Sequence, residues 1–113
     1  ARLAELRAFM AAAQPHHEYG LSLKSLADRL QLPPAELSRT INSAFGQIFN
    51  DFINERRVEA CKSALLDPAN AHLTLIAIAE SCGFNSKSTF NRAFKKFTGQ
   101  SPREFMQANR PED

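Results

Sequence analysis

The stretch Ile76–Phe105, IAIAESCGFNSKSTFNRAFKKFTGQSPREF, decides the fold of this 113-residue chain. Its apolar residues recur every three or four positions, which is the spacing of one face of a helix. Gly83 interrupts the pattern, and a second amphipathic run follows a short polar turn. Ala79 supplies a small side chain where two such helices cross. We therefore predict a helix-turn-helix unit, with Gly83 in a left-handed backbone conformation at its turn.

The same pattern occurs a second time, nearer the N-terminus. The copies align over two blocks, Leu23–Leu32 with Leu75–Phe84 and Leu37–Phe52 with Phe90–Phe105. The offset is 52 residues in the first block and 53 in the second, so the later copy has one extra residue in its turn. Ala27 takes the place of Ala79, and Gln31 stands where the later copy has Gly83. Two copies are too few for a solenoid and indicate a pair of helix-turn-helix units.

The whole chain has helical rather than alternating spacing, so we predict an all-α fold of about seven helices. The expected helices are Arg2–Ala13, Leu23–Leu30 after Ser22, Pro34 to about Phe45, Ile48–Leu66, the residues from the Thr74 cap to about Ser81, those from an Asn85 or Ser86 cap to Phe97, and those from a Ser101–Glu104 capping box to Ala108. Within the chain, 1–113, residues 1–46 and 68–108 form the two helix-turn-helix subdomains. A long central linker helix within 47–67 joins them, and its wide apolar arc packs on two sides.

Composition limits the other possibilities. The longest apolar run is too short to span a bilayer and no secretory signal is visible, so we expect this segment to be cytoplasmic, without membrane contact. Cys61 and Cys82 have no metal or redox spacing and are expected to be reduced and buried. The phenylalanines are expected in the core. His16, His17 and His72 lack a fourth metal ligand, and no catalytic set or phosphate loop is arranged, so we expect no metal, cofactor or enzyme activity.

Charge is distributed unevenly along the chain. The net charge is only +2, but Ser86–Arg103 contains five basic residues and no acidic one. This pattern permits an acidic partner such as DNA. On the fourth helix, acidic and basic residues alternate, which is typical of an exposed, salt-bridged face. These residues are Asp51, Glu55 and Glu59 with Arg56, Arg57 and Lys62. A surface for RNA polymerase is a further possible role for this face.

Together these residues resemble the AraC/XylS family of bacterial transcription regulators, over Leu21–Gln107. The densest part resembles the second helix-turn-helix of the family, through Ala79, Gly83-Phe84, Ser86, Phe90, Arg92, Phe94-Lys95, Gly99, Pro102 and Phe105. The first unit, LSLKSLADRLQLPPAELSRTINSAFG, resembles the more variable copy. Arg57-Val58, Ala60, Leu65 and Leu66 resemble the linker helix.

The resemblance implies sequence-specific binding of double-stranded DNA by a transcription regulator, more often an activator. It also implies two recognition helices in adjacent major grooves and, upstream, an effector or dimerisation domain. The base-reading positions it implies are Ala35, Ser38, Arg39 and Asn42 in the first unit and Lys87, Ser88, Asn91 and Arg92 in the second. The first recognition helix has few long polar side chains, so we expect the second to provide most of the specificity.

Side-chain chemistry suits this assignment. Arginine pairs with guanine O6 and N7, and asparagine pairs with adenine N6 and N7. Arg39 and Arg92 have two alternatives: they contact phosphates, or they pair with carboxylates inside the fold. Lys95, Lys96 and Arg103 are expected to neutralise phosphates, unless they form only a solvated face. Ser86 is expected at a phosphate because helix N-termini favour anions.

The length of the predicted linker helix also fits binding to two grooves of one DNA duplex. A helix of about 19 residues is about 28 Å long, and one DNA turn is about 34 Å. The linker helix could therefore hold two recognition helices over successive major-groove segments. The alternative hypothesis is an all-α protein-interaction module for an acidic partner. Salt-sensitive binding that also depends on base sequence would distinguish the two.

Overall fold

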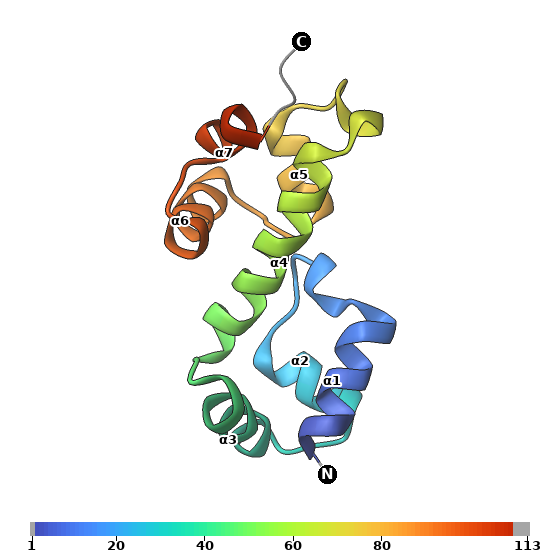
Figure 1. Ribbon diagram of the computed structural model, residues 1–113. Coiled ribbons are helices and arrows are strands. Elements are labelled where there is room, and N and C mark those ends of the chain that lie inside the picture. The colour runs from blue at the N-terminus through green and yellow to red at the C-terminus, as the bar shows by residue number, and fades with distance from the viewer. Residues whose placement is uncertain (1, 110–113) are drawn as a thin grey trace.

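The computed structural model describes residues 2–109, which form seven α-helices and two short 3-10 helices and no strand (Figure 1). The elements are α1 (Arg2–Ala13), η1 (Pro15–His17), α2 (Leu23–Leu30), α3 (Pro34–Phe45), α4 (Phe49–Leu66), η2 (Pro68–Asn70), α5 (Leu75–Ser81), α6 (Lys87–Thr98) and α7 (Pro102–Asn109). The predicted all-α class is confirmed. Among these residues, no helix is both long enough and apolar enough to cross a bilayer.

Side-chain caps determine where several helices begin. Ser22 and Thr74 each accept a hydrogen bond from the backbone N–H three residues later. Ser86 rather than its neighbour caps α6, because its Oγ accepts from the N–H of Thr89 at 3.1 Å. The predicted capping box of α7 is present: Glu104 N donates to Ser101 Oγ at 3.1 Å, and Ser101 N donates to Glu104 Oε1 at 2.8 Å. Each such cap contributes about 1 kcal/mol to stability.

Three details differ from the sequence prediction. Helix α4 begins at Phe49 because Ile48 has extended backbone angles and acts as its N-cap. Helices α6 and α7 each extend one residue further than predicted. The segment after α1, predicted as a plain polar loop, contains η1. Gln14 turns the chain through a left-handed conformation, with φ of 46°, and buries the ring of Pro15.

The hydrophobic core consists of two clusters. The first contains Leu6, Met10, Leu26, Ala27, Leu37, Ile41, Phe52 and Ile53. The second contains Val58, Cys61, Leu65, Ile78, Ala79, Cys82, Phe84, Phe90, Ala93, Phe94 and Phe105. Helix α4 contributes side chains to both, as its wide apolar arc predicted. Both cysteines are free and buried, which also agrees with the prediction.

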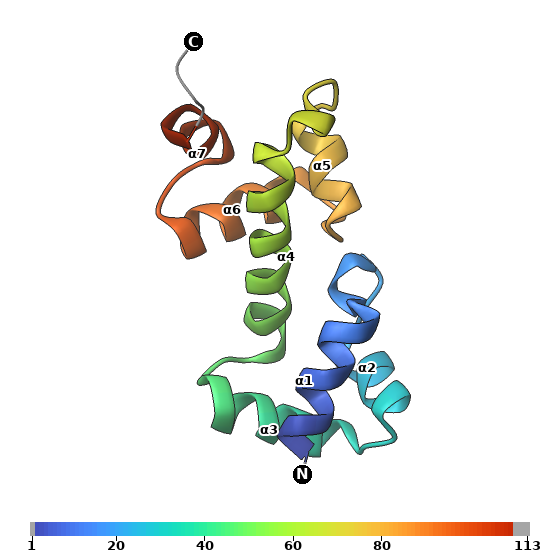
Figure 2. The ribbon, with the colours of Figure 1, turned by 45° about the vertical axis from the view of Figure 1, so that its right-hand side comes forward.

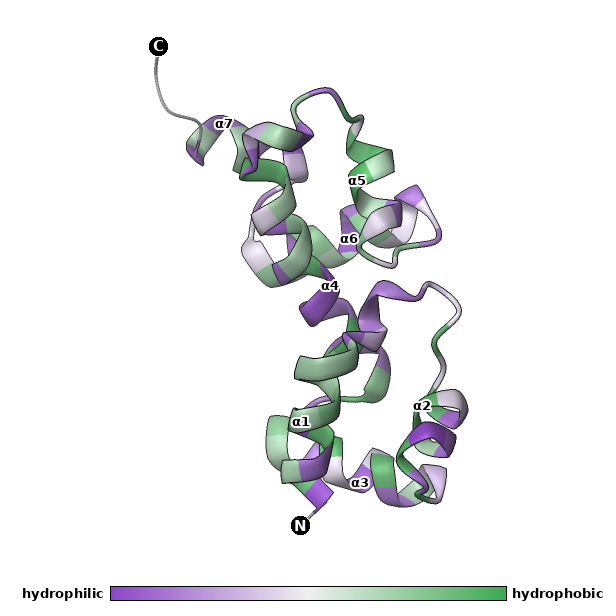
Figure 3. Ribbon diagram, turned by 90° about the vertical axis from the view of Figure 1, so that its right-hand side faces the viewer, coloured by the Kyte–Doolittle hydropathy of each residue, from purple (hydrophilic) through white to green (hydrophobic). Residues whose placement is uncertain are grey.

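The molecule is elongated, and its two ends are arranged alike. Its extents are 50 × 24 × 23 Å. In Figure 2, α6 crosses the upper half of α4 and α3 passes below its lower end; both extend to the left of α4, whereas α1, α2 and α5 lie to its right. Figure 1 shows the same order of elements from another angle. Figure 3 shows that the middle of α4, between the two halves, is hydrophilic. The second helix of each helix-turn-helix unit is therefore presented on a common side of the molecule.

Candidate nucleic-acid interface

Helix α6 presents a polar face opposite its buried one. Phe90 and Phe94 point into the second cluster, with 2% and 0% of their surfaces exposed. The four predicted base-reading residues are all exposed: Lys87, Ser88, Asn91 and Arg92. Asn91 lies four residues after Lys87 and three after Ser88, and Arg92 lies four after Ser88, so these side chains are neighbours on the helix surface. The structure thus brings the four together on a single face.

Helix α3 has the same design with smaller side chains. Leu37 and Ile41 are fully buried in the first cluster. On the other side of the helix, the predicted residues Ala35, Arg39 and Asn42 are exposed and Ser38 is partly exposed. Only one of these four side chains is long and charged. The face therefore offers fewer groups for base contacts than that of α6.

In the part of the chain that the structure describes, the guanidinium groups of Arg39 and Arg92 make no polar contact with the fold. Both side chains are exposed. Within residues 2–109, neither forms an ion pair or a side-chain hydrogen bond, whereas Arg2 pairs with Glu36 at 3.1 Å and Arg29 pairs with Glu18 at 2.9 Å. The alternative in which Arg39 and Arg92 pair with carboxylates inside the fold therefore has no support in the described residues.

The four candidate phosphate ligands differ in their surroundings. Lys95 and Arg103 are exposed. Lys96 Nζ contacts Asp51 Oδ2 at 2.9 Å, which links α6 to α4. That ion pair is solvent-exposed, with 54% of the lysine side chain accessible, so it contributes at most about 1 kcal/mol. The hydroxyl of Ser86 is engaged in capping α6 but remains at the surface.

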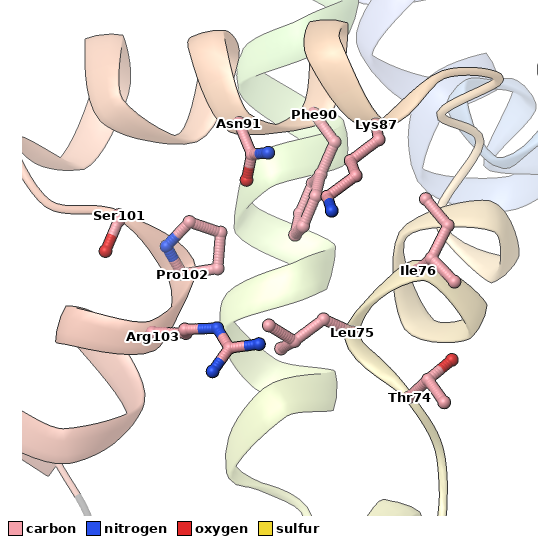
Figure 4. Close-up of a pocket in the computed structure, with 9 residues that line it drawn as sticks. All are labelled: Thr74, Leu75, Ile76, Lys87, Phe90, Asn91, Ser101, Pro102 and Arg103. Carbon is pink, nitrogen blue, oxygen red and sulfur yellow. The ribbon is translucent and has the colours of Figure 1, made fainter.

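A cleft of about 570 Å³ adjoins the α6 face (Figure 4). Lys87 and Asn91 line it from α6, Arg103 from α7, and Leu75 and Ile76 from the start of α5. Two predicted base-reading residues and one predicted phosphate ligand thus meet at one hollow. The apolar lining from Leu75 and Ile76 was not predicted from the sequence, although Ile76 is 37% exposed. Apolar side chains in such a place suit deoxyribose or a thymine methyl group.

The polar face predicted for α4 is only partly correct. Lys62 contacts Glu59 at the surface as expected, at 3.4 Å. Arg56 and Arg57, however, are partly buried, and burial lowers the pKa of each. Arg56 lies over the ring of Phe52, with 3.7 Å between the guanidinium carbon and the ring centroid. Arg56 pairs with Glu55 at 4.0 Å as expected. Both arginines nevertheless pack against neighbouring groups of the fold, so neither lies on a fully exposed face.

His16 lies beside these two arginines. Burial, followed by the nearby His17, Arg56 and Arg57, lowers the pKa of His16 from 6.5 to about 4. Its buried Nδ1 has no hydrogen-bond partner among the described residues. The imidazole is therefore neutral in the folded chain at neutral pH. No group of three or more His, Cys, Asp or Glu side chains within residues 2–109 is placed to hold a metal ion.

The stability of the domain should fall as pH falls from 6.5 toward 4. In this window the unfolded chain binds a proton at His16 while the folded chain does not, so protonation favours unfolding. Solvent screens the charge on a partly buried ring, so we expect the free energy of unfolding to fall by only about 2 kcal/mol across this window. Urea denaturation at several pH values measures it. His16→Gln should flatten this dependence, and an unchanged profile would contradict the assignment. His72→Gln, at an exposed position, is the control.

Comparison with known proteins agrees with this arrangement. A family model described as "Helix-turn-helix domain" matches residues 26–108. An uncharacterized HTH-type transcriptional regulator of Staphylococcus aureus (strain COL) is 33% identical over 90 residues, which are 80% of this chain and 12% of that protein. The C-terminal domain of AraT, a response regulator from Geobacillus stearothermophilus, is 28% identical with a TM-score of 0.80, over 96% of this chain and 88% of that one.

A solved structure with lower identity shares the fold. A transcriptional regulator from Chromobacterium violaceum, described by its AraC-type DNA-binding domain, is 21% identical with a TM-score of 0.77, over 98% of this chain and 95% of that one. The fold and the exposed second helices define a domain with two helix-turn-helix units. The chain belongs to the helix-turn-helix family of AraC-type DNA-binding domains. It spans only 12% of the length of the staphylococcal relative.

Proposed function

We propose that this chain binds double-stranded DNA sequence-specifically, with α3 and α6 in adjacent major grooves. The observation that favours this most is that both recognition helices extend to the same side of α4 (Figure 2), and that their polar faces are exposed. The 18 residues of α4 are about 27 Å long, close to one DNA turn of about 34 Å. The 50 Å length of the molecule is enough to contact both groove segments.

Within this proposal the side chains have different roles. Arg92, Asn91 and Arg39 make base contacts, since their groups match purine edges and the two guanidiniums have no partner in the described fold. The remaining base-reading positions are Lys87, Ser88, Ala35, Ser38 and Asn42. Lys95 and Arg103 neutralise phosphates. Lys96 does so after exchanging Asp51 for a phosphate, and Ser86 contributes the N-terminal end of α6.

The complete protein is proposed to be a bacterial transcription regulator, as its relatives' names describe for them. We propose that it activates transcription in the cytoplasm and that a further region senses an effector or forms dimers. Contact with RNA polymerase would use an exposed surface outside the two recognition faces, for which Glu59 on α4 is a candidate. A reporter gene with the selected site at its promoter, with and without the complete protein, tests the direction of regulation.

Arg92→Ala should relax base preference at one position. Loss of a bidentate contact to guanine costs about 1 to 3 kcal/mol, so affinity for the preferred site should fall about 5- to 150-fold. Lys95→Ala should instead weaken all sequences alike and reduce the slope of log K against log salt by about 1. Site selection on random DNA, followed by titration at several salt concentrations, measures both effects.

Lys62→Ala is the matched control, because it removes one positive charge on α4 rather than on a recognition helix. It should leave both the preferred site and its affinity nearly unchanged. An Arg92→Ala variant that keeps full base preference would exclude direct readout by that side chain. If the unmodified chain selects no sequence but still binds acidic proteins in a salt-sensitive way, the protein-interaction hypothesis is correct instead.

A further inference from the structure

The loop after α1 touches the turn of the second helix-turn-helix unit. Gly83, in that turn, is buried and has φ of +106°. A Cβ atom at this position would overlap the carbonyl oxygen of His16 and would lie 2.8 Å from Nε of Arg57. The backbones of the two halves are therefore in direct contact, at a point where only glycine leaves enough room.

Arg57 joins these two segments to a third, helix α4. From α4 its Nε donates a hydrogen bond to the carbonyl oxygen of His16 at 2.8 Å, and its Nη2 donates to the carbonyl oxygen of Glu18 at 2.9 Å. Its guanidinium carbon lies 5.9 Å from the ring centroid of Phe84, the residue after Gly83. One side chain thus contacts the linker helix, the loop of the first half and the turn of the second half.

The loop is itself anchored to the first half. Both carboxylate oxygens of Glu18 accept hydrogen bonds from Arg29 at the end of α2, at 3.0 and 2.9 Å. Arg29 also lies 5.1 Å above the ring of Phe9 on α1. The ring of Pro15 is buried. A displacement of the loop relative to Arg57 would therefore also displace α1 and α2, which pack against the recognition helix α3.

Polar contacts are prominent where the two halves meet. The two hydrophobic clusters are separate, and the part of α4 between them is the hydrophilic run Asn54–Arg57 (Figure 3). Asn54 Oδ1 accepts a further hydrogen bond from Arg57 Nη1 at 3.3 Å. Because the two hydrophobic clusters lie on either side of this polar run, the angle between the halves depends largely on hydrogen bonds and on the close fit of the two backbones.

We propose that Arg57 is a positioning residue: it fixes α3 relative to α6 and so determines the spacing between the two DNA segments that the domain accepts. The inference rests on the proposed two-groove binding. A planar guanidinium reaches two carbonyl oxygens at once, whereas an ammonium group makes a less directional contact. Specificity would then depend on a residue outside both recognition helices.

Spacing variants of the selected site test this. One added base pair moves one segment by about 3.4 Å and rotates it by about one tenth of a turn. The unmodified chain should lose about 10-fold or more in affinity when one base pair is added or removed between the segments. This loss is of the same size as that caused by one mismatched base pair in a site. Arg57→Met should lose only about 2- to 3-fold on the same change, with somewhat weaker binding at the optimum. Arg57→Lys should be intermediate.

Lys62→Met is the control, since it makes the same kind of change on the exposed side of α4. It should keep the strict spacing profile. Circular dichroism confirms that each variant is folded before DNA is added. A strict profile in folded Arg57→Met would overturn the proposal. If the unmodified chain selects no DNA sequence, the proposed function has failed rather than the role of Arg57.

A distance measurement without DNA tests the positioning directly. Spin labels at Ser43→Cys on α3 and Ser88→Cys on α6 occupy exposed positions, whereas the native cysteines are buried. Electron–electron resonance should give a narrow distance distribution for the otherwise unmodified chain and a broad one with Arg57→Met. A broad distribution in the unmodified chain, or identical distributions in the two, would contradict the proposal whatever the chain binds.

Discussion

Gly83→Ala should lower the free energy of unfolding by about 3 kcal/mol or more, and with it abolish specific DNA binding. Two costs add at this position. The backbone has φ of +106°, which side-chain-bearing residues rarely adopt, and the new methyl group would overlap the carbonyl oxygen of His16. Gly83 is buried, and the carbonyl oxygen of His16 is held by Arg57 Nε at 2.8 Å, so neither backbone can shift without disturbing other contacts. Urea denaturation followed by circular dichroism measures the loss.

Gly99→Ala is the matched control for this experiment. Gly99 ends α6 with φ of +79°, but a methyl group there would meet no atom within 4 Å. The substitution should therefore cost only about 1 kcal/mol, the conformational part of the effect. Equal losses at Gly83 and Gly99 would show that close approach to the loop contributes nothing. The difference between the two variants isolates the contact between the halves.

Phe94→Ala should destabilise the second half by about 3 to 5 kcal/mol. Phe94 has 0% of its surface exposed. Its ring lies 5.9 Å from that of Phe90 and 5.4 Å from that of Phe105, so it joins α6 to α7. Its removal leaves a cavity that surrounding rings cannot easily fill. Because α6 is the recognition helix proposed to give most specificity, selective binding should be lost as well.

Amide hydrogen exchange shows where the damage from Phe94→Ala lies. The two clusters are separate, so protection should fall first on α5, α6 and α7, while amides of Leu26 and Ile41 in the first cluster stay protected longer. Ile41→Ala should reverse this order. If either substitution lowers protection equally in both halves, the domain unfolds as one cooperative unit, and the separate-cluster expectation is wrong.

Much of the fold was predictable because its determinants are local in sequence. The Ser101–Glu104 capping box, the proline at the start of α3 and the apolar spacing of α6 each involve residues within a few positions of one another. The internal repeat then extended a strong pattern in the second unit to a weaker one in the first. Gln31, which takes the place of Gly83 in the first unit, adopts the left-handed conformation expected of a glycine there, with φ of 59°.

The features that the sequence did not reveal depend on contacts between distant segments. Arg57 and His16 are 41 residues apart, and Lys96 and Asp51 are 45 residues apart. Alternating charges on α4 indicated an exposed face, but charge alone does not show whether an arginine points to water or to a backbone carbonyl. The exposed side of each recognition helix followed from periodicity, whereas the cleft beside α6 required the positions of α5 and α7.

The separation of buried and exposed positions on α6 has a consequence for divergence among duplicated genes. Phe90 and Phe94 hold the helix in place, and the four exposed positions contribute little to that packing. Substitutions at the exposed positions can therefore accumulate one at a time without a compensating change in the core. With the proposed base-reading role of these positions, a copy of this gene could change its preferred DNA site through a series of folded intermediates, while the arrangement of its two halves stays the same.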